Sequence, residues 1–181
     1  MSQFKTIKES QITLSDLMLP SYSNFSGKIH GGHILGLMDQ VAFACASRHS
    51  GHYCVTASVN RVDFLHPVEV GEILHLRASI NYTGKTSMVV GVRVESENIQ
   101  TGKVNHCNSS YFTMVAKNAK GENVQVPGLV LDSSDAVRRY VRSIWRQEDT
   151  KVRADKFNEK EFKLEAYIGL LETYNVKVEL D

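Results

Sequence analysis

Apolar residues recur at helical spacing from Ile34 to about Arg48, and this pattern predicts one long helix with a continuous apolar stripe. Gly51 is expected to end the helix as its C-cap. Asp39 lies within the stripe, one helical turn from apolar residues on either side. The apolar positions of the helix are Ile34, Leu35, Leu37, Met38, Val41, Ala42, Phe43, Cys45 and Ala46.

Two interpretations of Asp39 follow from this position. Burying an unpaired carboxylate on an apolar face costs on the order of several kcal/mol of folding free energy. Asp39 therefore either reaches water or a structural partner at the rim of the stripe, or belongs to a functional site. Gly31-Gly32, at the start of the helix, lets the backbone approach a ligand closely. The free N–H groups of the first turn would then face a carbonyl oxygen that gains negative charge. A glycine pair alone is also typical of a flexible turn.

Downstream of the helix the apolar pattern changes to a period of two, which predicts strands. Short turns, such as Thr83-Gly84-Lys85, join them and indicate an antiparallel meander. A long apolar helix followed by such strands predicts an α+β fold, a curved antiparallel sheet wrapped around one central helix. An opening strand before Pro20 precedes the helix. The four predicted strands cover residues 53–64, 73–82, 86–97 and 104–116.

The character of the chain changes after residue 118. We predict one domain over residues 1–118, a linker over 119–131 around Pro127 and Gly128, and a C-terminal helical extension over 132–181. Ser133 or Ser134 can cap the helix that begins there. No function is assigned to residues 150–181.

Composition and charge exclude several classes of partner. The chain has 181 residues, 42% hydrophobic and 23% charged, with a formal net charge of +1. This balance argues against nucleic acid or an anionic membrane as a partner. No apolar run is long enough to span a membrane, and no signal peptide is recognisable, so we expect a cytoplasmic protein without membrane insertion. The three cysteines are expected to be reduced packing residues. His30 and His33 lack a third metal ligand in the motif, so no metal site is predicted.

Two motifs, in this order, resemble the hotdog-fold acyl-CoA thioesterases, and most closely the YciA-type and brain-type cytosolic acyl-CoA hydrolases. The resemblance covers about residues 10–118. It implies a hotdog fold and an enzyme that hydrolyses fatty acyl-CoA to a free fatty acid and CoA, with no cofactor, because coenzyme A is part of the substrate. The first motif is Asn24-x-x-Gly27 with His30-Gly31-Gly32-x-Ile34-Leu35-x-x-Met38-Asp39-x-x-Ala42, and the second is the run over residues 55–71.

The resemblance also implies which residues form the catalytic site. The residues matching the family's catalytic groups are Asn24 and Asp39, which come from different subunits at a dimer interface. The backbone N–H of Gly32 or His33 would polarise the thioester carbonyl. Asp39 would act as a general base or as a nucleophile. Asn24 can alternatively be only a turn residue. We expect a homo-oligomer, at least a dimer and by resemblance a hexamer built as a trimer of dimers. The exposed edge strand of such a sheet also needs a partner.

The turn over residues 84–87 is the second candidate for substrate contact. It resembles the family segment that meets the pantetheine and phosphates of CoA, which assigns CoA binding to Gly84, Lys85, Thr86 and Ser87. The alternative is an ordinary hairpin turn with a solvated lysine. The arginines of the C-terminal helix can reach the 3′-phosphate of CoA or a neighbouring subunit, or form a solvated face.

Two other functions compete with hydrolysis. A hotdog dehydratase needs a catalytic histidine with an acidic partner, and the chain has no Asp-x-Asn-x-x-His motif. A non-catalytic acyl-CoA-binding sensor would bind the ester without releasing CoA. The acyl chain length is not determined by the sequence.

Overall fold

A computed structural model describes residues 4–156, 168–169 and 174–179. The chain divides into two compact units, Met1–Ser143 and Ile144–Asp181, and the site lies in the first. The elements are β1 (Phe4–Thr6), α1 (Ile7–Ser10), β2 (Ile12–Leu17), the 3-10 turn η1 (Pro20–Tyr22), α2 (Gly31–Ser50), β3 (Tyr53–Val59), β4 (Ile73–Thr83), β5 (Ser87–Glu97), β6 (Val104–Lys117), β7 (Gly128–Val130) and α3 (Ser134–Lys156).

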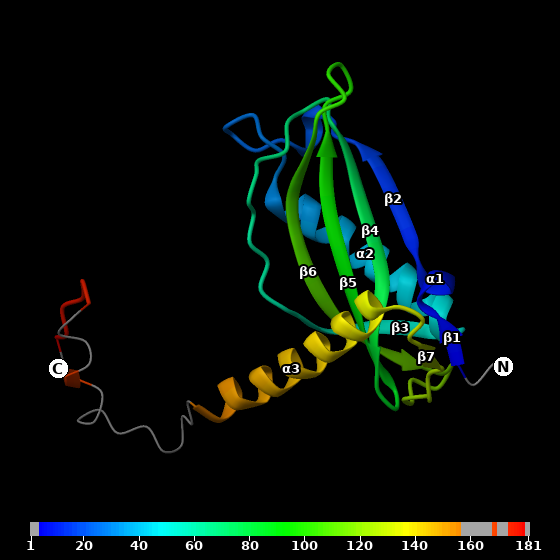
Figure 1. Ribbon diagram of the computed structural model, residues 1–181. Coiled ribbons are helices and arrows are strands. Elements are labelled where there is room, and N and C mark those ends of the chain that lie inside the picture. Colours follow the sequence, from blue (N-terminus) through cyan, green and yellow to red (C-terminus); the bar gives the residue numbers. More distant parts are fainter. Residues whose placement is uncertain (1–3, 157–167, 170–173, 180–181) are drawn as a thin grey trace. The chain divides into compact units, whose positions relative to one another are not determined.

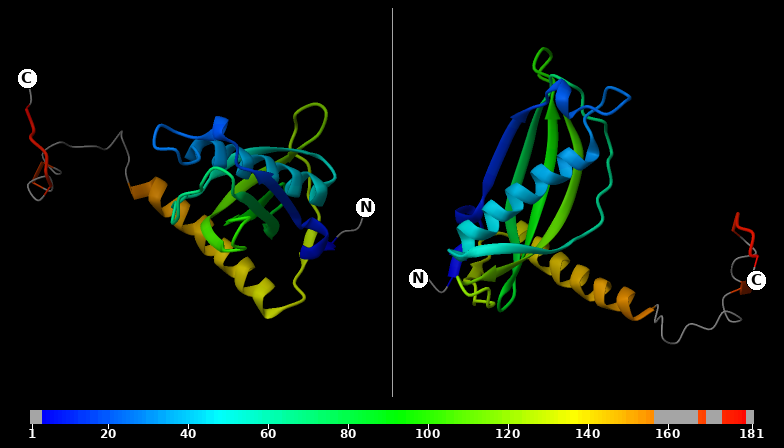
Figure 2. Two further views of the ribbon diagram at one scale, coloured as in Figure 1. Left: turned by 90° about the horizontal axis from the view of Figure 1, so that it is seen from above. Right: turned by 180° about the vertical axis from the view of Figure 1, so that it is seen from behind.

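A curved antiparallel sheet wraps around α2, as the sequence predicts (Figures 1 and 2). Its strand order in the described residues is β2-β4-β5-β6-β3, so β2 and β3 are the edges. Alternate residues of β4, β5 and β6 point at the helix and are buried, which explains the period of two. The core on the α2 side of the sheet includes Leu74, Leu76, Ile80, Val90, Val92, Val94, Phe112, Met114 and Ala116.

Both ends of α2 are capped by side chain and backbone features that the sequence places there. The His30 imidazole accepts from the Gly32 N–H, and Gly51 adopts the left-handed conformation at φ 73°, with its N–H donating to the Ser47 carbonyl. Ser133 caps α3 in the same way, because its hydroxyl accepts from the Ala136 N–H.

The first predicted strand is shorter than expected, since β3 ends at Val59 and not at residue 64. Its ladder with β6 is interrupted by a bulge between Thr56 and Ser58. Beyond Val59 the Ser110 hydroxyl is within hydrogen-bond distance of the carbonyls of Asn60 (3.1 Å) and Arg61 (3.4 Å). The Asn60 N–H still donates to the Tyr111 carbonyl of β6 at 2.9 Å, so the Ser110 hydroxyl adds a side-chain contact to a backbone pairing that extends just past Val59.

Three short elements of the first unit, β1, α1 and β7, were not indicated by the alternation of apolar residues. The polar residues before the opening strand form β1 and α1, and α1 begins with a capping box between Thr6 and Glu9. The segment predicted as a linker contains β7, which pairs in parallel with β1, and Val126 packs in the core. Such pairing depends on residues far apart in sequence. The predicted domain boundaries themselves stay a prediction.

The N-terminal part of α3 is attached to the sheet by Tyr140. Its hydroxyl donates to the Thr83 carbonyl at 3.2 Å, and its ring lies 5.0 Å from the ring of Tyr82. Most of the predicted helical extension after residue 156 lies outside the described residues. None of the described helices is long and apolar enough to cross a membrane.

The buried His49 predicts a loss of stability in mild acid. Burial lowers the pKa of His49 below its ordinary value of 6.5, although its contact with the Pro127 carbonyl at 2.9 Å acts in the opposite direction. The unfolded chain therefore binds a proton more readily, and the stabilising contribution of neutral His49 is complete above pH 6.5 and declines as the pH falls below it. We expect the melting temperature to drop between pH 7 and pH 5, and to drop less in His49→Gln. Equal pH dependence of the two proteins would contradict this assignment.

Candidate active site

Asp39 lies in the middle of α2 and is held by Thr56 of β3. The Thr56 hydroxyl donates to Asp39 Oδ1 at 2.6 Å and lies 3.4 Å from the sulfur of Met114. Within residues 4–156, the second carboxylate oxygen of Asp39 makes no hydrogen bond to protein. One oxygen is thus oriented and the other is open. The sequence did not indicate Thr56, because a threonine in a strand is ordinary unless the register that brings it to Asp39 is known.

Asp39 is exposed in the single chain, so its place in the apolar stripe does not mean that the chain buries it. Leu35 and Phe43, one turn before and after it, are 36% and 37% exposed. The sheet of one chain therefore leaves this face of α2 open. Beside it, the edge strand β3 exposes Tyr53, whose ring lies 5.5 Å from the ring of Phe43. An apolar face with a carboxylate at its centre and a free strand edge is typical of an interface.

Asn24 lies in the loop before α2, where its side-chain oxygen organises the turn. This oxygen accepts from the Ser26 N–H (2.9 Å), the Ser26 hydroxyl (2.7 Å) and the Lys28 N–H (3.2 Å). Gly27 completes the turn at φ 77°. The Asn24 side chain therefore stabilises this turn, which is the structural role that the sequence left open beside a catalytic one. Its amide nitrogen makes no hydrogen bond within residues 4–156, so this side chain can act as a donor only.

The two backbone amides predicted to polarise a carbonyl oxygen have partners within the chain. The Gly32 N–H donates to His30 Nδ1 at 3.0 Å, and the His33 N–H donates to the His30 carbonyl at 2.9 Å. The Gly32 position is exposed, and displacing the imidazole would free its N–H. The His33 N–H belongs to the helical turn itself, and freeing it would unwind that turn. Both assignments stay predictions.

The predicted CoA-binding turn forms as expected and lies far from the start of α2. Gly84 donates to the Ser87 carbonyl at 2.8 Å, and the carbonyl of Lys85 accepts from Val126 at 3.1 Å. This turn closes the β4–β5 hairpin at the end of the sheet opposite the N-terminus of α2 (Figure 1). One chain therefore does not bring residues 84–87 together with Gly32.

The cysteines are free and buried, as predicted for packing residues. Burial raises the pKa of Cys45 to about 12, which keeps its thiol protonated at neutral pH and unsuited to nucleophilic attack.

Comparison with known proteins identifies the family to which the chain belongs. The sequence profile of the thioesterase superfamily matches residues 26–103. A Bacillus subtilis protein named uncharacterized acyl-CoA thioester hydrolase YkhA is 30% identical over 81% of this chain and 85% of its own length. The chain belongs to the hotdog-fold acyl-CoA thioester hydrolases. The resemblance and the fold class predicted from the sequence are thereby confirmed.

Solved structures of other acyl-CoA thioester hydrolases share the fold. A hexameric acyl-CoA thioesterase without ligand is 35% identical, with a TM-score of 0.83 over 86% of this chain and 99% of that one. The Staphylococcus aureus acyl-CoA hydrolase with butyryl-CoA and CoA is 28% identical, with a TM-score of 0.78 over 94% and 99%.

Variants of the Staphylococcus aureus hydrolase match the candidate residues in spacing. Three of its structures carry alanine in place of an asparagine, an aspartate or a threonine. The intervals between those three positions are the same as the intervals between Asn24, Asp39 and Thr56.

Proposed function

We propose that this protein hydrolyses fatty acyl-CoA thioesters to a free fatty acid and CoA, with Asp39 as the catalytic carboxylate. The observation that carries this proposal is the contact between Asp39 and Thr56 on the open face of α2. It leaves one oxygen of the carboxylate available to a water molecule or to the thioester. The spacing shared with the Staphylococcus aureus variants supports the same pair and adds Asn24.

Three groups would carry out the hydrolysis: the Asp39 carboxylate, the Asn24 amide and the Gly32 N–H. As a general base, Asp39 removes a proton from water while that water attacks the thioester carbon; as a nucleophile, it forms a mixed anhydride that water then cleaves. The Asn24 amide nitrogen donates to the water or the carbonyl oxygen, since its own oxygen is used in the loop. The Gly32 N–H supplies the second donor after the His30 imidazole moves away, a contribution of about 3–4 kcal/mol for one such donor.

We propose further that the site is completed by a second copy of the chain. Antiparallel pairing of two β3 edges about a two-fold axis would place the α2 helices side by side in opposite directions. The start of α2 in one chain would then lie at the end of the partner's sheet that carries residues 84–87. Lys85 is exposed there and can meet a phosphate of CoA. The hexameric relative supports a trimer of such dimers as the assembly. A cytoplasmic location stays a prediction.

Mixing two inactive variants tests the shared site. Asp39→Asn subunits and Asn24→Ala subunits, each nearly inactive alone, are dissociated reversibly and reassembled together. If Asn24 and Asp39 of one site come from different chains, about a quarter of all sites in the mixture contain both groups, and activity returns to about that level. The readout is release of free CoA thiol from acyl-CoAs of increasing chain length.

Recovery in the mixture distinguishes a shared site from one built within a chain. Reassembly of either variant with itself is the control and should recover nothing. No recovery in mixtures shown to contain both subunits would contradict the shared site. Binding of acyl-CoA by the wild type without thiol release would favour the non-catalytic sensor.

A further inference from the structure

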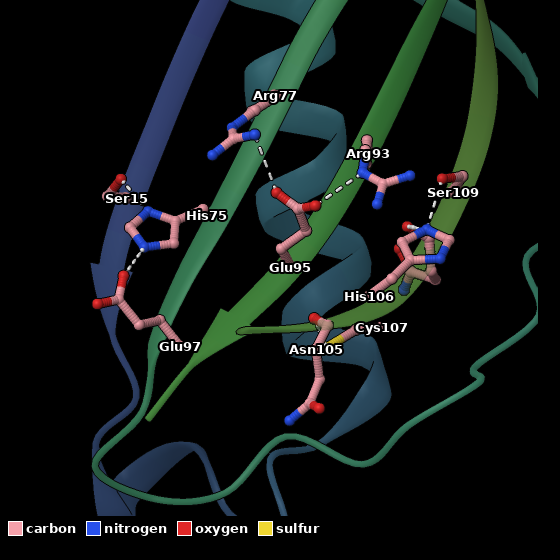
Figure 3. Close-up of polar contacts among 11 residues, drawn as sticks. Ser15, His75, Arg77, Arg93, Glu95, Glu97, Asn105, His106, Cys107 and Ser109 are labelled. Carbon is pink, nitrogen blue, oxygen red and sulfur yellow. Dashed lines mark hydrogen bonds and ion pairs between the residues drawn. The ribbon is translucent and has the colours of Figure 1, made fainter. Parts of the chain in front are cut away.

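The outer face of the sheet, away from α2, carries polar side chains that thioester hydrolysis at Asp39 does not use (Figure 3). Alternation along β4 directs Leu74 and Leu76 to the core, where they are 0% exposed, and directs His75 and Arg77 outward. The residues opposite them on β2 and β5 point to the same outer face.

Ser15, His75 and Glu97 form a hydrogen-bonded array across three strands. His75 Nδ1 lies 2.8 Å from the Ser15 hydroxyl, and His75 Nε2 lies 2.8 Å from Glu97 Oε2 (Figure 3). Ser15 pairs directly with His75 in the β2–β4 register. A carboxylate only accepts hydrogen bonds, so Nε2 carries the proton of the neutral ring. Nδ1 then keeps its lone pair and accepts the hydrogen bond of the Ser15 hydroxyl, so the ring can act as a base toward this serine, with its two nitrogens in exchanged places relative to a Ser-His-Asp triad.

We propose that Ser15 is a nucleophile on the outer face of the sheet and accepts an acyl group from an activated ester or thioester. The Ser15 oxygen attacks the carbonyl carbon, and its proton moves to His75 Nδ1. The bond from that carbon to the leaving oxygen or sulfur breaks, and the leaving group takes the proton from His75. The products are an O-acyl Ser15 and a free alcohol or thiol, while Glu97 continues to accept the hydrogen bond of His75 Nε2.

The exposure of these side chains suits the reaction. Ser15 is exposed, whereas the His75 and Glu97 side chains are 21% and 37% exposed, so the base is partly shielded and the nucleophile is open. Arg77 follows His75 on the outer face, and one of its nitrogens lies 3.1 Å from Glu95 (Figure 3). Arg77 is engaged by this carboxylate, and the reaction at Ser15 uses only His75 and Glu97.

The same face contains a serine–histidine pair that lacks this arrangement and serves as an internal comparison. His106 Nε2 lies 2.9 Å from both the Asn108 carbonyl and the Ser109 hydroxyl. The carbonyl only accepts, so Nε2 donates to it and has no lone pair to offer Ser109. Thr13 is a second comparison, because it is exposed on β2 two positions before Ser15 and lies opposite Arg77 in the register.

Covalent labelling of the full chain with a fluorophosphonate probe tests whether Ser15 is activated. Mass spectrometry should place the adduct on Ser15, formed at least about tenfold faster than on Ser109 or Thr13. His75→Gln should slow labelling at least about tenfold, and Glu97→Gln should slow it less, because the glutamine still orients the ring. Thr13→Ala is the matched control and should change nothing. No adduct on Ser15, or equal labelling in His75→Gln, would overturn the proposal.

Acyl transfer is measured with p-nitrophenyl acetate in an Asp39→Asn background, which separates this site from the proposed thioesterase site. We expect a burst of about one p-nitrophenolate per chain and an acetyl group on Ser15. The burst should vanish when Ser15→Ala is added. Ser15→Ala alone should leave acyl-CoA hydrolysis unchanged, so failure of one proposal is distinguishable from failure of the other. A burst that survives Ser15→Ala would assign the acyl group to another residue and reject Ser15.

Discussion

Replacing Asp39 with asparagine is expected to lower the turnover of acyl-CoA by about two to four orders of magnitude with the fold intact. Asparagine keeps the volume and can still accept the hydrogen bond from Thr56, which spans 2.6 Å in the native chain. It lacks the charge and the basicity needed to take a proton from water or to attack the thioester. The measurement is the kcat for CoA thiol release, with circular dichroism and melting temperature recorded for both proteins.

A matched variant at Thr56 separates the contribution of the Asp39 carboxylate from that of the hydroxyl that orients it. Thr56→Val keeps the carboxyl group of Asp39 but removes the hydroxyl that orients it, so the loss of turnover should be smaller, about tenfold. If Asp39→Asn keeps more than a tenth of wild-type turnover, Asp39 is not the catalytic carboxylate. If Thr56→Val loses as much as Asp39→Asn, the threonine has a role of its own in the reaction.

Replacing Phe43 with aspartate is expected to dissociate the assembly and lower turnover about a hundredfold. Phe43 is 37% exposed on the face of α2 that also carries Asp39, and its ring lies 5.5 Å from that of Tyr53 on the edge strand. If a second chain covers this face, an added carboxylate there loses its water without gaining a partner. Each separated chain would then lack the partner's contribution to the site.

Sedimentation velocity and thiol release at one protein concentration measure the two effects together. Phe43→Leu is the conservative control and should retain both size and activity. Ile99→Asp is a second control, because Ile99 is 55% exposed and lies on the β5–β6 turn and not on α2 or β3. A Phe43→Asp protein that keeps its size and full activity would place the interface elsewhere on the chain.

Local patterns were sufficient for the elements that position the site. The helical spacing after Gly31 predicts α2, and the period of two predicts β4, β5 and β6 with ends that differ from the structure by one residue. These patterns are readable because one face of each element is buried in a single core, and burial imposes the period of that element on its apolar residues. Resemblance to the family then singled out Asn24 and Asp39.

Contacts between residues far apart in the sequence could not be predicted from local patterns. The bond between Thr56 and Asp39 depends on the position of β3 against α2 and on the bulge after Thr56. The apolar stripe alone did not indicate the open face of α2, since it is equally compatible with a helix enclosed within one chain. An apolar stripe predicts that a helix face is covered, and it does not tell whether the same chain or a second chain covers it.

The sequence by itself determined the class of fold, the helix that carries Asp39 and the loop that carries Asn24, because each depends on residues that are neighbours along the chain. Only the tertiary structure decided which groups meet. Antiparallel pairing set Ser15 beside His75 and Glu97, and it placed residues 84–87 at the far end from Gly32. A shift of β2 by one residue against β4 would turn Ser15 to the other face of the sheet, so its partners follow from register and not from composition.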